Sequence, residues 1–366
     1  MRTIDFVAGA RPNFMKLSPV LRAIETLGLI DARIIHTGQH YDYGMNEVFF
    51  KQLGIPEPHV HLEVGSGSHG AQTARILERY EAHLLKSPPI ATVVFGDVNS
   101  TIACALASVK LGIPVVHVEA GLRSRDRTMP EEINRILTDA VADLLLVSEP
   151  SGITNLEGEG VARDKIRFVG NVMIDVLVRE LPRAEALKTY KRLGLKRRAY
   201  GLATVHRPSN ADDPAVLERL LLYLRDLSGR LPIVFPVHPR TRNAAKKAGL
   251  EKLLSTGYPF VAVEPLPYLE NLCLMASAAM VLTDSGGMQE ETSFLKIPCL
   301  TLRENTERPV TIQKGTSRLV GNDIGAVKNA VDDILQGRWP PGEEIELWDG
   351  HASERVAASI SERFCH

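Results

Sequence analysis

Short apolar runs rich in β-branched residues recur along the chain and alternate with longer stretches of helical periodicity. In the first half these runs are residues 4–8, 33–36, 91–95, 114–118, 143–147 and 166–169. Strands that are apolar on both faces and separated by helices are typical of a parallel sheet covered by helices on both sides. The first half is therefore predicted to be an α/β domain.

The pattern restarts in the second half, at residues 200–205, 233–237, 260–263, 280–283, 299–302 and 318–320. A length of 366 residues suits two domains better than one core. We expect two Rossmann-like, doubly wound α/β domains that face each other across a cleft, spanning residues 1–170 and 171–351 and joined near Gly170. The last helix, expected within residues 352–366, could return to the first domain.

Charge and cysteine usage narrow the class of protein. The formal net charge is -1, from 43 basic and 44 acidic side chains, which argues against a protein that coats nucleic acid or an anionic membrane. The four cysteines show no CxxC pairing and suit a reducing compartment. No signal-peptide pattern follows Met1, and no apolar segment reaches the roughly 20 residues that span a bilayer. A cytoplasmic protein is expected.

The first apolar run leads into residues 9–16, which place Arg11 and Lys16 beside the start of a helix. Two cations near a helix N-terminus favour a phosphate group. The alternative is an ordinary strand-to-helix turn whose charges are solvated.

Three carboxylates follow strands or begin a helix in the first half: Asp97, Glu119 and Glu131. Glu131 and Arg135 are four residues apart and should share one helix face, whereas Glu132 should be rotated away. The three carboxylates form a candidate acid–base set because the carboxyl ends of parallel strands meet at one edge. Each taken singly could instead be a helix cap or a surface ion pair.

In the second half, His206 and His238 each follow a strand and precede a cation, although an isolated histidine is more often structural. A stronger signal is Ser285-Gly286-Gly287, because glycines after a strand let backbone amides at a helix N-terminus approach a diphosphate. Glu291, one turn into that helix, could accept hydrogen bonds from ribose hydroxyls. The alternative is a tight turn without a ligand.

Two further motifs carry less weight. Residues 65–70 satisfy GxGxxG, but they follow a proline-rich loop and no strand-end acid lies at the spacing of the dinucleotide fingerprint. His59 and His61 lack further ligands nearby in the sequence, so no metal is predicted. No cofactor is expected.

Several segments together resemble the non-hydrolysing UDP-N-acetylglucosamine 2-epimerase family. In order they are GARPNFMK (9–16), TGQHYD (37–42), GD (96–97), HVEAGLR (117–123), MPEEINR (129–135), GN (170–171), HR (206–207), PVHP (236–239), TDSGGMQEE (283–291) and TERP (306–309). The resemblance covers nearly the whole chain. It implies the two-domain GT-B glycosyltransferase architecture, a homodimer and a C-terminal helix that packs on the first domain.

The resemblance also implies roles for matching positions. Asp97, Glu119 and Glu131 would be acid–base groups, and His206, the fourth predicted catalytic residue, would face the diphosphate. The predicted substrate-binding residues are Arg11, Lys16, Arg135, His238, Ser285, Gly286, Gly287, Glu291 and Arg308. Family members eliminate UDP from UDP-N-acetylglucosamine (UDP-GlcNAc), pass through 2-acetamidoglucal, and add UDP back after protonation on the opposite face, which yields UDP-N-acetylmannosamine (UDP-ManNAc).

The chain departs from the family pattern in three places. Many members have a glutamate where this chain has Ser209, and some have an aromatic residue for uracil where this chain has Asn271. Residues 39–42 differ from the pattern of members activated by their own substrate. The main alternative is a 2-epimerase of a more decorated UDP sugar, such as a diacetamido-uronic acid. A GT-B glycosyltransferase, a hydrolysing epimerase and a non-catalytic nucleotide-sugar binder are further alternatives.

Overall fold

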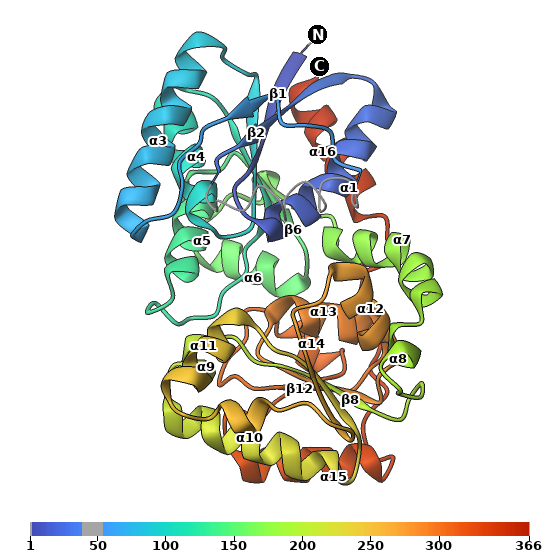
Figure 1. Ribbon diagram of the computed structural model, residues 1–366. Coiled ribbons are helices and arrows are strands. Elements are labelled where there is room, and N and C mark those ends of the chain that lie inside the picture. The colour runs from blue at the N-terminus through green and yellow to red at the C-terminus, as the bar shows by residue number, and fades with distance from the viewer. Residues whose placement is uncertain (1, 39–53, 366) are drawn as a thin grey trace. The chain divides into compact units, whose positions relative to one another are not determined.

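The chain folds into two α/β units. The structure is a computed structural model that describes residues 2–38 and 54–365, apart from the side chain of Arg11. One compact unit comprises Met1–Val176 and Glu346–His366, and the other comprises Leu177–Ile345. The chain passes from the first unit to the second inside helix α7 (Val172–Leu187) (Figure 1).

In the described part of the first unit, seven parallel strands form one sheet in the order β3-β2-β1-β4-β5-β6-β7. Their bounds are β1 Arg2–Ala8, β2 Ile30–His36, β3 Val60–His61, β4 Ala91–Phe95, β5 Val115–Ala120, β6 Leu144–Val147 and β7 Ile166–Phe168. The order reverses direction between β1 and β4. In sheets of this kind, ligands bind beyond the carboxyl ends of the strands at such a switch point.

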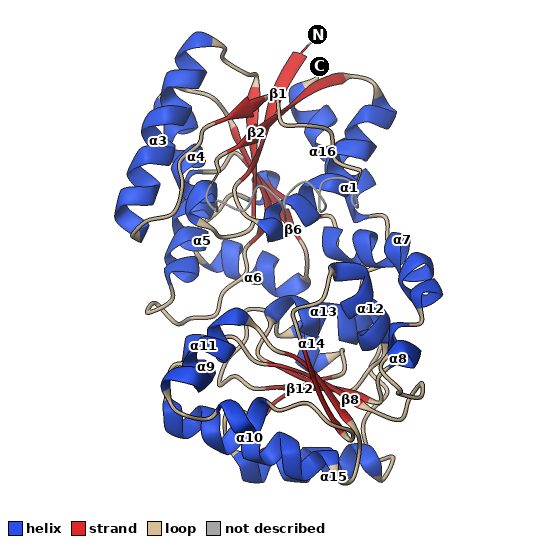
Figure 2. Cartoon of the chain, viewed as in Figure 1, coloured by secondary structure: helices blue, strands red, loops and turns tan. Residues whose placement is uncertain are grey.

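Helices cover this sheet (Figure 2). They are α1 Arg11–Leu27, α3 His69–Lys86, α4 Asn99–Lys110, α5 Pro130–Val141, α6 Pro150–Gly158, the first part of α7, and α16 Ala352–Phe364, with a 3-10 turn at Arg163–Lys165. Helix α4 is buried along most of its length, and its side chains are mostly small, including Ala103, Cys104, Ala105 and Ala107. Small side chains allow the backbone of α4 to pack closely between α3 and α5.

The last helix, α16, belongs to the first unit and packs against α1. Buried Asp175 holds its N-terminus by accepting hydrogen bonds from the backbone N–H groups of Ala352 (3.1 Å) and Ser353 (2.6 Å). Trp348 donates from Nε1 to the carbonyl of Ser148 at 2.9 Å. The two bonds to Asp175 satisfy N–H groups of the helix that would otherwise lack a partner.

The second unit repeats the design. Six parallel strands of its described residues form a sheet in the order β10-β9-β8-β11-β12-β13, with the switch point between β8 and β11. The strands are β8 Gly201–Thr204, β9 Ile233–Pro236, β10 Phe260–Val263, β11 Met280–Thr283, β12 Cys299–Thr301 and β13 Ser317–Leu319. The helices are α8 Thr189–Arg192, α9 Pro208–Ala211, α10 Pro214–Ser228, α11 Pro239–Lys247, α12 Tyr268–Ser277, α13 Gly286–Leu295, α14 Val310–Gln313 and α15 Ile324–Leu335, with a 3-10 turn at Glu251–Leu254.

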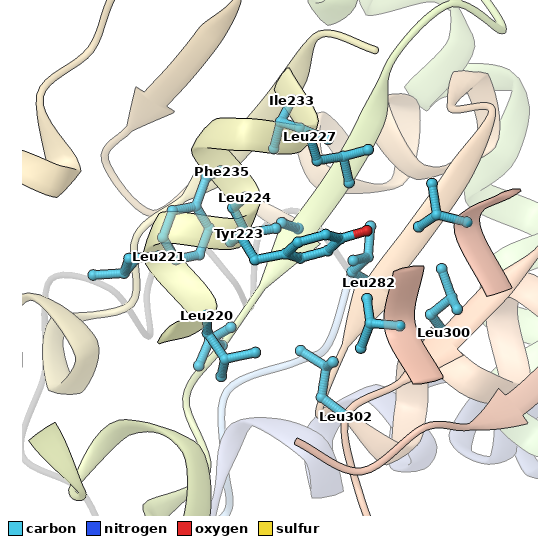
Figure 3. Close-up of a cluster of buried hydrophobic side chains, with 14 of the residues drawn as sticks. Leu220, Leu221, Tyr223, Leu224, Leu227, Ile233, Phe235, Leu282, Leu300 and Leu302 are labelled. Atoms are coloured by element: carbon cyan, nitrogen blue, oxygen red, sulfur yellow. The ribbon is translucent and has the colours of Figure 1, made fainter. Parts of the chain in front are cut away.

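Helix α10 supplies much of one core of this unit (Figure 3). Pro214 occupies its first turn, and the Asp213 carboxylate caps it by accepting the backbone N–H groups of Ala215 and Val216. Its buried side chains pack with those of the neighbouring strands in a set of apolar residues that includes Leu220, Leu224, Leu227, Ile233, Phe235, Leu282 and Leu300.

The predicted fold class is confirmed, since both halves are doubly wound parallel sheets flanked by helices. Each predicted apolar run overlaps an observed strand, and β3 is an additional strand of two residues that the pattern did not reveal. The arrangement of the domains about a cleft stays a prediction. Among the described residues, no helix combines the length and apolar character needed to cross a bilayer.

Candidate active site

In the first unit, Glu119 is set apart by its backbone. It has φ 72° and lies inside β5, where the register with β6 shifts between Val118 and Ala120. Left-handed φ values are uncommon for residues other than glycine, and a bulge of this kind redirects a side chain at the end of a strand. Buried Glu119 Oε2 lies 2.6 Å from Nζ of buried Lys16, which comes from α1. A predicted acid–base group and a predicted substrate-binding cation thus form one ion pair.

The turn after β4 passes directly beside this ion pair. Gly96 has φ +63°, and a Cβ at this position would lie 2.8 Å from Lys16 Nζ and 3.9 Å from Glu119 Oε1. A side chain would therefore meet both the strained backbone angle and the lysine. Because Gly96 immediately precedes Asp97, the close approach also positions the next carboxylate.

Asp97 pairs with Arg135, another predicted substrate-binding cation of this unit. Arg135 Nη1 lies 2.5 Å from Asp97 Oδ2, and its Nε and Nη2 donate to Glu132 Oε2 at 3.1 and 2.8 Å. The expectation that Glu132 turns away from Arg135 is wrong, because residues three apart on a helix are also neighbours. Glu131 is half-buried in the same first turn of α5.

Glu132 is a positioning group that the sequence analysis missed. Its carboxylate also accepts the backbone N–H groups of Ser124 (2.9 Å) and Arg125 (2.8 Å). Burial by itself would raise the pKa of Glu132, but these bonds and Arg135 lower it overall. An ionised Glu132 therefore fixes the guanidinium that contacts Asp97.

The turn between β1 and α1 is held by Asn13. Its Oδ1 accepts the backbone N–H groups of Gly9 (3.3 Å) and Ala10 (3.1 Å), and its Nδ2 donates to the carbonyl of Phe95 (2.8 Å). Asn13 thereby ties the ends of β1 and β4 together at the switch point. Arg11 begins α1, and its side chain lies outside the described part of the structure.

In the second unit, Asp284 is fully buried directly after β11 and bonds to the segment that contains the predicted residue His206. Its carboxylate accepts the backbone N–H groups of His206 (2.9 Å) and Arg207 (2.8 Å) and the side-chain amide of Asn210 (3.2 Å). Its Oδ1 also lies 2.7 Å from His206 Nδ1. Burial opposes ionisation, but the bonds from His206 and Arg207 lower the pKa of Asp284 below its usual value.

Asp284 therefore orients His206, and the sequence offered a signal for it as an acid directly after an apolar run. The His238 ring lies 5.4 Å from the His206 ring, and His238 Nδ1 accepts the backbone N–H of Arg240 at the start of α11. The two predicted histidines thus lie together beyond β8 and β9, with distinct hydrogen-bond partners.

The N-terminus of α13 carries the predicted glycine turn. Ser285 is its N-cap, and the Ser285 backbone N–H donates to Thr283 Oγ1 at 3.0 Å. A Cβ on Gly286 would lie 2.8 Å from both Arg308 Nη1 and Glu307 Oε1, whereas the space around Gly287 is open. Gly286 is therefore required for close packing against the guanidinium, and Gly287 leaves room beside the helix end.

Arg308 does reach this helix end, but its charge is compensated. Its Nε lies 2.5 Å from Glu290 Oε1 and its Nη1 lies 2.5 Å from Glu307 Oε1. Glu307 also pairs with Arg303 at 2.7 Å. Two arginines and two glutamates form this buried cluster, so an anion there would rely on the amides of α13 as well as on Arg308.

Glu291 is buried on α13 and accepts a hydrogen bond from the Tyr268 hydroxyl at 3.0 Å. Burial is the main cause that raises the pKa of Glu291, to about 7, and the nearby Glu290 adds to the rise. Asn271, considered for base recognition, is half-buried in the first turn of α12.

Replacing Glu291 by Gln should flatten the dependence of stability on pH. The folded wild type holds the Glu291 proton until a pH of about 7, whereas the unfolded chain releases it near 4.5. The free energy of unfolding of the wild type should therefore fall as pH rises through this window. Urea unfolding at a series of pH values checks this. A Glu291→Gln protein that gains nothing over the wild type above pH 7 would contradict it.

Two other segments considered in the sequence analysis are not among the site residues described above. Residues 65–70 lead into α3, where Ser68 Oγ accepts the backbone N–H of Ala71 and Gln72 donates to the carbonyl of Gly65. Residues 39–42, considered for substrate activation, lie outside the described residues.

Comparison with known proteins identifies the family of the chain. The model of the family described as UDP-N-acetylglucosamine 2-epimerase matches residues 22–361. A UDP-N-acetylglucosamine 2-epimerase from Methanocaldococcus jannaschii is 41% identical over 365 residues, which is 98% of each chain. A UDP-2,3-diacetamido-2,3-dideoxy-D-glucuronate 2-epimerase from Pseudomonas aeruginosa is 42% identical over 364 residues, covering 97% of this chain and 98% of the relative.

Among solved structures, the M. jannaschii UDP-GlcNAc 2-epimerase in complex with UDP-GlcNAc and UDP superposes with a TM-score of 0.90 at 39% sequence identity. The match covers 98% of this chain and 99% of that chain. A family model and relatives that extend over nearly the entire length leave no large segment unaccounted for. The chain belongs to the UDP-N-acetylglucosamine 2-epimerase family.

Proposed function

We propose that this protein interconverts UDP-GlcNAc and UDP-ManNAc by eliminating and re-adding UDP. The observation that carries the proposal is the pairing of Glu119 with Lys16 and of Asp97 with Arg135 on either side of the Gly96 turn. Two carboxylates at adjacent strand ends can remove a proton from one face of a sugar carbon and return one to the other face. Family membership supports the same reaction.

The first step is an elimination. The hydrogen on C2 of the sugar is not acidic, so its removal must accompany loss of UDP from C1. A carboxylate takes the C2 proton, the C2–H electron pair forms the C1=C2 double bond, and the C1–O bond breaks with its electrons leaving on UDP. In this proposal the carboxylate is Glu119 or Asp97, and Glu131 completes the acid–base set.

The second step reverses the first with the opposite stereochemistry. A carboxylic acid protonates C2 of 2-acetamidoglucal on the other face, and UDP adds again at C1. Lys16 and Arg135 lie within ion-pair distance of the carboxylates and can stabilise the changing charges. No net oxidation occurs.

In the second unit, we propose that the α13 N-terminus binds the diphosphate through Ser285, Gly286 and Gly287. Phosphate binding at a helix N-terminus rests on its unpaired N–H groups and on the positive end of the helix dipole. His206, oriented by Asp284, would stabilise the departing diphosphate. Glu291 would receive the ribose hydroxyls.

Incubation of the purified protein with UDP-GlcNAc in D₂O, followed by proton NMR, tests the proposal. We expect UDP-ManNAc to accumulate and deuterium to replace the C2 hydrogen in both sugars. Turnover without deuterium at C2 would reject the elimination mechanism. Free N-acetylmannosamine as the main product would indicate a hydrolysing epimerase, and transfer only to an added acceptor would indicate a glycosyltransferase.

A second substrate deserves the same assay because one relative at 42% identity is a UDP-2,3-diacetamido-2,3-dideoxy-D-glucuronate 2-epimerase. Both sugars carry the acetamido group at C2, so the acid–base chemistry would be identical. Competition between the two UDP sugars, measured as the ratio of kcat/KM values, decides between them. Exclusive turnover of the decorated sugar would show that UDP-GlcNAc is not the substrate.

Replacing Asp284 by Asn should lower kcat/KM by about 10²-fold, in the range found when a positioning group is lost. The amide keeps the size of the side chain but cannot accept from both His206 and the Arg207 backbone as a carboxylate does. The UDP affinity, measured by calorimetry, should also fall. Asp332→Asn, at an exposed ion pair with Arg230, is the control. Equal activities of the two variants would contradict the role of Asp284.

A further inference from the structure

His117 is a fully buried histidine in the middle of β5 that the proposed reaction does not use. Its Nε2 lies 2.8 Å from the carbonyl oxygen of Gly96, and its Nδ1 lies 2.6 Å from Asp139 Oδ1. A carbonyl oxygen can only accept, so Nε2 carries a hydrogen. His117 thus joins the Gly96 turn to Asp139 on α5.

The charges around Asp139 favour its ionised form. Its Oδ2 accepts the backbone N–H of Gly121 at 3.0 Å and Nη1 of Arg123 at 2.7 Å. Burial by itself would raise the pKa of Asp139, but His117 and Arg123 lower it overall. Arg123 is in turn held by a two-bond contact with Glu159, at 2.8 and 2.6 Å.

Asp139 is therefore bonded to both His117 and Arg123, and exposed Glu159 pairs with the other side of the Arg123 guanidinium. A buried charge is stable only when it is paired and hydrogen-bonded, and buried Asp139 meets that condition.

We infer that His117 is a positioning residue whose Nε2–H holds the Gly96 carbonyl and thereby the turn on which Asp97 and the Lys16–Glu119 pair depend. The Gly96 backbone N–H donates to the carbonyl of Val118 at 3.0 Å, so both polar groups of the Gly96 backbone are bonded to β5. The effect on turnover rests on the proposed function. The contact between His117 and the Gly96 carbonyl does not.

The matched variants His117→Gln and His117→Asn separate the two bonds of the imidazole. The glutamine amide nitrogen can occupy the position of Nε2 and donate to Gly96, whereas the asparagine nitrogen reproduces only Nδ1 and donates to Asp139. We expect His117→Asn to lower kcat by about 10²-fold, as small misplacements of catalytic groups do. KM and the UDP dissociation constant should stay unchanged, and His117→Gln should recover most of the lost kcat.

Nitrogen NMR of protein labelled with ¹⁵N-histidine tests the contact with Gly96 without any substrate. The His117 signals are identified by their absence from the His117→Asn spectrum. The Nε2 nitrogen should show the shift and the one-bond coupling of a ring nitrogen that carries a hydrogen. An Nε2 nitrogen without a hydrogen would overturn the inference.

Two further outcomes keep this inference distinct from the proposed function. If the wild type turns over no UDP sugar, the proposed function fails. The ¹⁵N result and the ¹³C shift of the Gly96 carbonyl still decide the inference. That carbonyl shift should move in His117→Asn and not in His117→Gln. If both variants lose kcat equally and their Tm values fall together, His117 is merely structural and the positioning role is overturned.

Discussion

Replacing Glu119 by Gln should lower kcat for epimerisation by about 10³-fold, within the range of losses when a general acid or base is removed. The amide retains the shape of the side chain and its left-handed backbone but can no longer take a proton from C2. The UDP affinity should hardly change, because the proposed diphosphate contacts come from α13. NMR time courses of UDP-GlcNAc conversion give kcat. Calorimetric titration with UDP gives the UDP affinity.

Loss of fold must be separated from loss of chemistry in this variant. Lys16 is buried 2.6 Å from Glu119, so Glu119→Gln leaves a buried charge unpaired and should cost about 3 kcal/mol of stability. The double variant Lys16→Met with Glu119→Gln removes both charges and should recover stability without recovering activity. A double variant that regained wild-type kcat would remove Glu119 from the acid–base set.

Replacing Asp97 by Asn should lower kcat by about 10²- to 10⁴-fold with little loss of stability. Asp97 is only partly buried, and Arg135 keeps its contacts with Glu132 when the Asp97 charge is removed. The same NMR assay gives kcat, and thermal unfolding gives Tm. Isotope exchange should also tell the Glu119 and Asp97 variants apart, since a variant that lacks only one of two proton-transfer groups should still exchange the C2 hydrogen of one epimer.

Asp143→Asn is the matched control for this variant. Asp143 lies beside the start of β6, at the amino edge of the same sheet, and is paired loosely with Lys165 at 3.9 Å. It has the same chemistry as Asp97 but lies at the opposite end of the strands. We expect wild-type kcat for Asp143→Asn. Activity in Asp97→Asn equal to that of this control would show that Asp97 takes no part in proton transfer.

The sequence pattern was sufficient for the two sheets because a parallel strand buried on both faces must be apolar along its length. The strand ends could also be read, and polar residues after such strands pointed to Asp97, Glu119 and the Ser285-Gly286-Gly287 turn. Strand ends and glycine turns are determined by residues that are adjacent in the chain, so they can be predicted from a single sequence.

Pairing between side chains could not be read in the same way. Helical spacing favoured Glu131 as the partner of Arg135, but the structure pairs Arg135 with Glu132 and with Asp97. Which glutamate pairs with Arg135 depends on how α5 packs against the loop at Ser124, whose backbone N–H donates to Glu132. Contacts between residues far apart in the chain are decided by packing.

By itself, then, the sequence determined the α/β class, the paired sheets and the polar strand ends, because hydrophobic periodicity and turn chemistry are properties of short segments. Only the tertiary structure revealed that Lys16 neutralises Glu119, that Asp284 orients His206, and that His117 contacts the Gly96 carbonyl. Each of these is a bond between elements that only folding brings within 3 Å. The charge and geometry of the candidate residues in each unit therefore arise from the packing of its sheet with its own helices and loops.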